Sequence, residues 1–146
     1  MLGTNGPSGR TAAGGFVGPV QAIGTCFRKF ATFSGRAGRA EYWWWVVFTI
    51  VVQGVMNLID RSAHLQYGSE YYGQRPGFIS TVAAVIILLP SIAVLFRRLH
   101  DTGRSGWWWA LNLVCCIGTI VVFILTLLPG QSEPNRYGST PGSALT

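Results

Sequence analysis

Three polar clusters interrupt an otherwise apolar chain, and they hold the residues whose types could do chemistry. The first covers residues 33–43 with the sequence FSGRAGRAEYW, and the second covers residues 97–108 with the sequence RRLHDTGRSGWW. The third is the short segment NRYG at residues 135–138. Arginine recurs in all three, and its guanidinium can bind a phosphate or carboxylate through two parallel hydrogen bonds. The clusters therefore suggest a site for anionic groups.

We take ten polar residues of these clusters as the candidate site for an anionic lipid headgroup or a partner protein. In this hypothesis three arginines of the second cluster surround the anion and two of the first cluster join them, because basic pockets beside transmembrane helices bind anionic lipids. The ten are Arg36, Arg39, Glu41, Arg97, Arg98, His100, Asp101, Arg104, Asn135 and Arg136.

The same residues also have ordinary structural roles. Glu41 suits the N-terminus of a helix, and Arg97 and Arg98 suit a helix C-terminus, because each charge opposes the helix dipole there. Asp101 could cap a following helix or hold a neighbouring cation. Arginines at membrane edges also set orientation. Anchors, caps and a turn thus explain the clusters without any ligand.

No catalytic, cofactor or metal site is expected. His100 and Asp101 form the one histidine–acid pair near other polar residues, and no P-loop, HExxH or nucleophile motif accompanies it. The three cysteines have no metal-ligand spacing, and two of them are neighbours inside an apolar run. We therefore expect a protein that is not an enzyme.

The composition indicates a membrane protein. Hydrophobic residues make up 49% and charged residues 11% of the 146, against about 25% charged in a soluble domain. The mean hydropathy is +0.37. These values exclude a disordered chain and argue against a soluble globule. The net charge of +6 would suit nucleic acid in a soluble protein, but here the cations follow the membrane edges, so we expect no nucleic-acid partner.

Three apolar runs predict an all-α integral membrane protein with three transmembrane helices. The runs cover about residues 42–59, 78–96 and 107–128, and none contains a charged residue. As helices they would be about 27–33 Å long, which matches a hydrocarbon core of about 30 Å. An alternative remains for the third run. Gly118 near its middle would let it fold as a hairpin of two short helices that returns to the side it came from.

We predict that the membrane domain covers residues 20–140, with a short tail on either side. Residues 1–19 are predicted to be a disordered tail and residues 141–146 a short C-terminal tail. Apolar residues at helical spacing predict an amphipathic helix over about residues 20–33, lying in the membrane interface or packed on the protein itself. With three spans and a cytoplasmic N-terminus, eight of the eleven Lys and Arg residues are cytoplasmic. The C-terminus would then lie outside.

Taken in order around the apolar runs, the three clusters resemble the motifs of a bacterial inner-membrane family, domain of unknown function 805. The matching stretches are FSGRAGRAEYW, RRLHDTGRSGWW and NRYG, and the resemblance covers about residues 22–140. Gly38 departs from the family pattern, which more often has Ser or Arg there. The resemblance implies a small multi-pass protein of the cytoplasmic membrane, and it implies no activity.

Two functional hypotheses follow. The first is a non-enzymatic membrane component that binds a partner protein or anionic lipid through a cytoplasmic Arg-rich face. The alternative is a subunit of a transport or envelope-stress system. Transport needs polar groups at membrane depth, where the runs offer chiefly Gln53, Asn57 and Asn112. Gln53 and Asn57 share a helix face and would equally suit contact with a second copy or another membrane protein.

Overall fold

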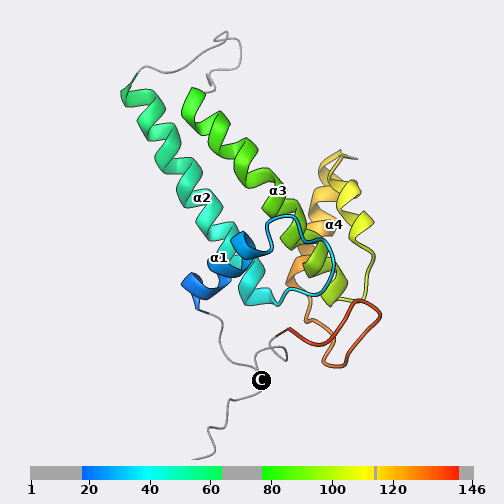
Figure 1. The fold of residues 1–146 in the computed structure, drawn as a ribbon. Helices are drawn as coiled ribbons and strands as arrows, with labels where there is room; N and C mark the ends of the chain where they lie inside the picture. The colour runs from blue at the N-terminus through cyan, green and yellow to red at the C-terminus, as the bar shows by residue number, and fades with distance from the viewer. Residues whose placement is uncertain (1–17, 64–76, 114, 142–146) are drawn as a thin grey trace, which may run out of the picture.

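The computed structural model describes residues 18–63, 77–113 and 115–141, and the described residues form helices and no strand. Two long helices stand side by side, and shorter elements gather around one end of this pair (Figure 1). Most of both predicted tails lies outside the described residues. The helices are α1 (Pro19–Arg28), α2 (Arg39–Ser62), α3 (Phe78–Asp101), the 3-10 helix η2 (Gly106–Leu113) and α4 (Cys115–Leu127).

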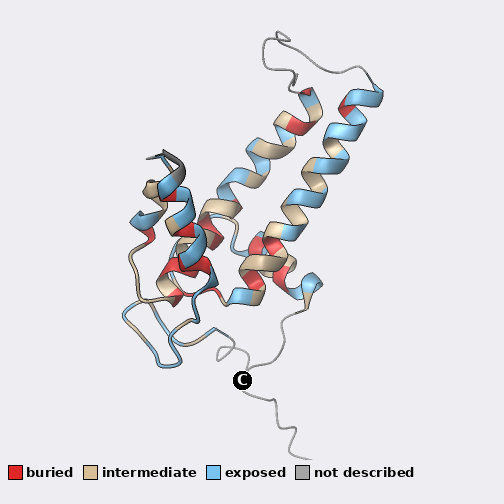
Figure 2. Cartoon of the chain, turned by 180° about the vertical axis from the view of Figure 1, so that it is seen from behind, coloured by how far each residue is buried: buried red, intermediate tan, exposed pale blue. Residues whose placement is uncertain are grey.

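Helices α2 and α3 are long and apolar enough to cross a membrane. Each has 24 residues and is therefore about 36 Å long, and together they contain the first two predicted spans. Their outer faces are apolar and open (Figure 2), with Ile50, Leu58 and Val85 each 66% exposed. Such a surface is unfavourable in water and suits contact with lipid chains.

The third apolar run does not form the single helix that was predicted for it. The run is divided into η2 and α4, which lie against each other as a hairpin. Gly118 makes this packing possible, because a Cβ there would lie 1.8 Å from the carbonyl oxygen of Leu111. The 13 residues of α4 are only about 20 Å long, which is shorter than the hydrocarbon core. The hairpin alternative describes this region correctly.

Both ends of the hairpin lie at the C-terminal end of α3. At its start, a Cβ on Gly106 would lie 2.1 Å from the ring of Phe96, so the two residues are in close contact. At its finish, Arg98 donates hydrogen bonds to the carbonyl oxygens of Thr126 and Leu128. The C-terminal end of the hairpin is therefore held beside the C-terminal end of α3.

The predicted amphipathic helix is present but shorter, because α1 ends at Arg28. Its apolar face packs on α2: Ala22 and Cys26 are fully buried, and the ring of Phe27 meets the indole of Trp45 edge-on at 5.2 Å. The opposite face stays open, with Gln21 and Arg28 exposed. Of the two alternatives for this segment, packing on the protein itself is the one observed.

Candidate functional site: a buried arginine cluster

Asp101, the last residue of α3, is the centre of a buried ion-pair cluster. One carboxylate oxygen accepts a hydrogen bond from Arg36 Nε at 2.9 Å and lies 2.8 Å from Arg36 Nη2 in an ion pair. The other oxygen accepts from Arg98 Nη1, one turn earlier on the same helix. Asp101 is 3% exposed and both arginine side chains are 0% exposed. Two cations thus share one buried carboxylate, which carries charge-assisted hydrogen bonds on both oxygens.

The remaining donors of these two arginines bind backbone carbonyl groups in the last turn of α4 and in the segment that follows it. Arg36 donates to the carbonyl oxygen of Glu133 at 2.7 Å and to that of Gln131. Arg98 donates from Nε to Thr126 at 3.1 Å and from Nη2 to Leu128. The carbonyl groups after a helix end have no intrahelical partner, so the guanidinium groups supply one. The cluster thereby holds the tail against α3.

Close approach of the tail depends on a glycine. The amide of Gln131 donates to the carbonyl oxygen of Asp101 at 2.9 Å. At the preceding position, Gly130, a Cβ would lie 2.0 Å from Asp101 Oδ2. No other residue type fits there unless the carboxylate moves.

A second buried ion pair joins α2 to α3. Arg97 Nη1 donates to Glu41 Oε1 at 2.5 Å, and the thiol of Cys26 on α1 lies 3.9 Å from the same oxygen as a weak donor. Among the described residues, Arg97 Nε and Nη2 have no hydrogen-bond partner although the side chain is fully buried. Burial, and then the charge of Glu41, raises the pKa of the Cys26 thiol from 9.0 to about 12. This thiol therefore stays protonated and unreactive at neutral pH.

His100 links the first cluster to the third through its ring and its backbone. Its ring stacks on that of Tyr137 with centroids 3.9 Å apart and planes 3° from parallel. Its Nδ1 lies 3.2 Å from the carbonyl oxygen of Gly35, and its own carbonyl accepts from Asn135 Nδ2 at 3.0 Å. The guanidinium of Arg136 covers the Tyr137 ring, 4.8 Å from its centre.

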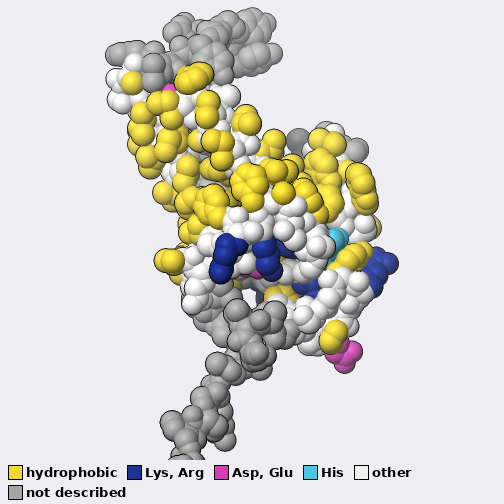
Figure 3. Space-filling model, viewed as in Figure 1, with side chains coloured by type: hydrophobic (Ala, Val, Ile, Leu, Met, Phe, Trp, Pro, Cys, Tyr) yellow, Lys and Arg dark blue, Asp and Glu magenta, His cyan; other side chains and the backbone are white. Residues whose placement is uncertain are grey.

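The ten predicted site residues therefore divide into two groups at one end of the molecule. Seven contact one another or the backbone inside the cluster: Arg36, Glu41, Arg97, Arg98, His100, Asp101 and Asn135. The other three, Arg39, Arg104 and Arg136, are exposed or half-buried. The buried arginines of the predicted anion site thus already bind the protein's own carboxylates and carbonyl oxygens. Figure 3 shows the exposed cations as a band below the apolar surface of the helices.

Sequence reasoning missed several residues that shape the structure. Asp60, at the far end of α2, is 1% exposed and accepts from the amides of Ile79 at 2.9 Å and Ser80 at 2.7 Å. It caps α3 from a neighbouring helix, and the available signal was a lone acid at the end of an apolar run. Cys26 gave no signal beyond its place on the apolar face of α1. Among the residues that the structure describes, no three metal-ligating side chains gather.

Comparison with known proteins places this architecture in a family. The model of a family described as "Protein of unknown function (DUF805)" matches residues 30–139. The chain belongs to the DUF805 family. It is 36% identical over 115 residues to the inner membrane protein YhaH of Escherichia coli K12, covering 78% of this chain and 90% of YhaH. It is 34% identical over 114 residues to the inner membrane protein YhaI of the same strain, covering 78% and 89%.

A third relative matches a smaller part of the chain. The uncharacterized protein YiiR of E. coli K12 is 34% identical over 85 residues, which cover 57% of this chain and 50% of YiiR. No solved structure matches the chain. Two relatives that match most of the chain are inner membrane proteins, which supports the bacterial inner membrane as the location of this DUF805 protein.

Proposed function

We propose that this DUF805 protein is a non-enzymatic component of the bacterial inner membrane that binds anionic phospholipid headgroups through its exposed cations. The observation that carries the proposal is the division of the arginines at one end of the molecule. Those in the buried cluster are paired internally, while a second set is open to the headgroup layer just below the apolar surface (Figure 3). We call this second set the basic rim: Arg28, Lys29, Arg39, Arg104 and Arg136.

The contacts of the tail support a topology in which the whole basic rim faces the cytoplasm. Arg36 precedes α2, His100 lies in the last turn of α3, and both bind residues of the segment 131–135 that follows the hairpin. These three parts of the chain therefore share one side of the membrane. With the hairpin returning to this side, nine of the eleven Lys and Arg residues lie there, which the positive-inside rule assigns to the cytoplasm. The hairpin would then dip into the cytoplasmic leaflet without crossing it.

Reporter fusions test this topology. A reporter active only in the cytoplasm, fused after Gly138, is expected to be as active as the same reporter inserted at Gly103. A fusion after Gly138 that is active only outside the cytoplasm would refute the hairpin topology and restore the three-span prediction.

The expected strength of headgroup binding follows from surface electrostatics. Each Lys or Arg close to an anionic leaflet contributes about 1 kcal/mol, and the attraction decays within a Debye length of about 8 Å at physiological salt. Five cations at one edge therefore give a clear local preference for anionic over zwitterionic lipids, and the preference should weaken as salt is raised.

The test is the lipid composition around the protein in bilayers that mix phosphatidylglycerol with phosphatidylcholine. A variant with Arg28→Gln, Lys29→Gln and Arg136→Gln is expected to lose most of the phosphatidylglycerol enrichment, measured with spin-labelled lipids by electron paramagnetic resonance. Arg61→Gln is the matched control, because Arg61 is an exposed arginine at the opposite end of α2. Equal enrichment in the triple variant and the wild type would refute headgroup binding by the basic rim.

The alternative role, a subunit of a transport or envelope-stress system, makes a different prediction. In that role a protein partner would contact the apolar outer faces of α2 and α3. It would therefore stay bound to the triple variant, even though that variant has lost the lipid preference. Cross-linking of the chain in native membranes, compared between the wild type and the triple variant, separates the two roles.

A further inference from the structure

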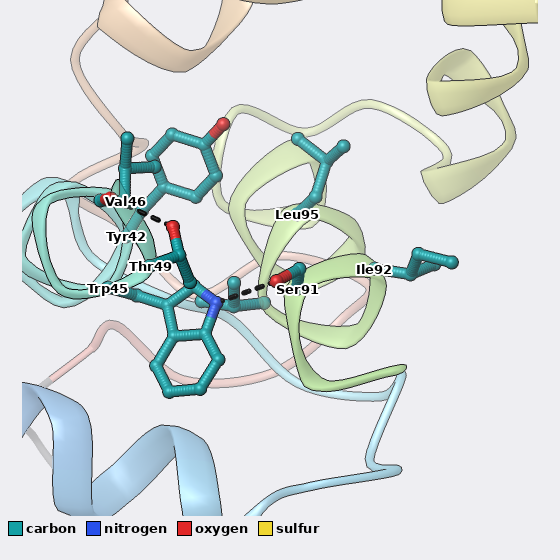
Figure 4. Close-up of a pocket in the computed structure, with 8 residues that line it drawn as sticks. Tyr42, Trp45, Val46, Thr49, Ser91, Ile92 and Leu95 are labelled. Carbon is teal, nitrogen blue, oxygen red and sulfur yellow. Dashed lines mark hydrogen bonds between the residues drawn. The ribbon is translucent and has the colours of Figure 1, made fainter. Parts of the chain in front are cut away.

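A groove runs between α2 and α3 in the half of the membrane domain nearest the buried cluster. It has a volume of about 200 Å³ and is lined on α2 by the two turns from Tyr42 to Thr49 and on α3 by the turn from Ser91 to Leu95. Figure 4 shows the lining residues, with Trp45 of α2 reaching across to Ser91 of α3. Both helices are long and apolar enough to span the membrane, so the groove lies at a depth where lipid chains surround the protein.

Three of the four polar side chains that line the groove, Trp45, Thr49 and Ser91, are already bonded within the protein. Trp45 reaches from α2 to α3 and donates from Nε1 to Ser91 Oγ at 3.0 Å (Figure 4). Ser91 in turn donates to the carbonyl oxygen of Ile87 at 2.8 Å. The hydroxyl of Thr49 donates to the carbonyl oxygen of Val46 at 2.8 Å. With these donors used, the lining chiefly offers carbon atoms, which favours a hydrocarbon occupant.

A cation lies at the mouth of the groove. Arg39 is the first residue of α2, three residues before Tyr42 and seven before Val46, so these residues share one helix face. Helical side chains lean toward the helix N-terminus, which directs Arg39 away from the apolar lining and toward the headgroup layer. Arg39 is exposed, and it forms no ion pair with any residue that the structure describes.

The start of α2 adds to this positive end. Its N-cap residue, Gly38, has no side chain to cap the first amide groups. Glu41 of this first turn pairs with the buried Arg97, and the helix dipole favours a further negative charge at this end. The groove thus has an apolar body and a positive mouth, in the order that a phospholipid presents its acyl chain and its phosphate.

We propose that this groove is a phospholipid-binding site, in which one acyl chain lies between α2 and α3 and the phosphate binds Arg39. The inference rests on the proposed headgroup binding and goes beyond it, because it assigns one site, one lipid and one stoichiometry where the basic rim gives only a general attraction. The volume suits a segment of a single chain, so the second chain would lie outside the groove against the apolar surface of the helices.

The test measures how much phospholipid remains bound to the full chain after extensive washing in a mild detergent, using native mass spectrometry. The wild type is expected to retain about one phospholipid per chain. Val46→Trp fills the groove and should lower retention at least fivefold. Arg39→Gln removes the mouth cation and should speed loss of the lipid about fivefold. The matched controls are Val47→Trp, which adds the same bulk on the exposed neighbouring position, and Arg28→Gln, which removes a rim cation away from the groove.

Retention that is absent in the wild type, or equal in Val46→Trp and Val47→Trp, would overturn the site. A second measurement covers the case in which Val46→Trp misfolds. Thr49→Cys, in a chain whose other cysteines are serine, should react with a small maleimide at least fivefold more slowly when phospholipid is added to the detergent. Equally slow reaction without lipid would mean that a second copy or a protein segment covers the groove, and would refute the proposal.

The two proposals fail separately. If the basic rim does not select anionic lipid, the triple variant still retains the groove lipid, because none of its three substitutions lines the groove. If the groove is empty, the phosphatidylglycerol enrichment by the basic rim persists in Val46→Trp.

Discussion

Replacement of Asp101 by Asn should destabilise the protein strongly while leaving the shape of the side chain almost unchanged. Asp101 is the shared acceptor of Arg36 and Arg98, whose side chains are fully buried. The asparagine amide offers one acceptor oxygen, and its NH2 group places a donor where the carboxylate had its other acceptor oxygen. Both arginines then lose their shared counter-charge, and one of them also faces a donor instead of an acceptor in a buried site.

The size of the effect follows from this geometry. Removing one partner of a buried ion pair costs about 3–5 kcal/mol, because the charge left behind is neither solvated nor paired. For a chain of this length, each kcal/mol lowers the midpoint of thermal unfolding by about 2–4 °C. We therefore expect Asp101→Asn to lower the midpoint by about 10 °C.

The assay is thermal unfolding in detergent, followed by the fluorescence of the chain's tryptophans. The control is Glu133→Gln, which neutralises an exposed acid at the same end and leaves the carbonyl oxygen that Arg36 binds. Loss of the cluster should also free the tail, so trypsin should cleave after Arg136 faster in Asp101→Asn than in the control. An unfolding midpoint equal to that of the control would refute the view that this cluster holds the fold together.

Four further predictions rest on the described contacts. Gly130→Ala should lower the unfolding midpoint, because its Cβ would lie 2.0 Å from Asp101 Oδ2, whereas Gly24→Ala, with open space around its Cβ, should not. In a chain whose other cysteines are serine, Cys26 should be alkylated at pH 8 about a hundredfold more slowly in the folded state than in sodium dodecyl sulfate, because burial raises its pKa to about 12. Since this pKa is raised above its unfolded value of 9.0, its contribution to stability is present below pH 9 and is lost as the pH rises toward 12, which unfolding midpoints measured from pH 8 to 11 would show. Asp60→Ala should cost about 1–2 kcal/mol by removing the cap of α3, and an unchanged midpoint would contradict that role.

The buried ion pairs give the three polar motifs a common physical explanation in this chain. The first motif supplies Arg36 and Glu41, the second supplies Arg97, Arg98 and Asp101, and the segment between α4 and the third motif supplies carbonyl acceptors. Motifs far apart in the chain thus complete one another's hydrogen bonds. The cations left outside this arrangement are the ones available to lipid.

The membrane location and the two long helices are determined by the sequence alone. The runs at 42–59 and 78–96 carry no charge and are long enough to cross a bilayer as helices that satisfy their own backbone hydrogen bonds, so they predict α2 and α3 directly. The motifs likewise sufficed for the family. These signals are local, and composition and length carry them.

Only the tertiary structure decided whether the third apolar run forms one helix or two, and which groups the arginines bind. Residues 107–128 are long enough to span a bilayer as one helix. Their division into η2 and α4 depends on the packing of Gly118 against Leu111 and on the hydrogen bonds from Arg98 to the carbonyl oxygens of Thr126 and Leu128. The pairing of Arg36 with Asp101 joins residues 65 positions apart. Hydropathy and charge counts describe positions one at a time. Whether an arginine faces a phosphate or a buried carboxylate depends on which distant segment folds beside it.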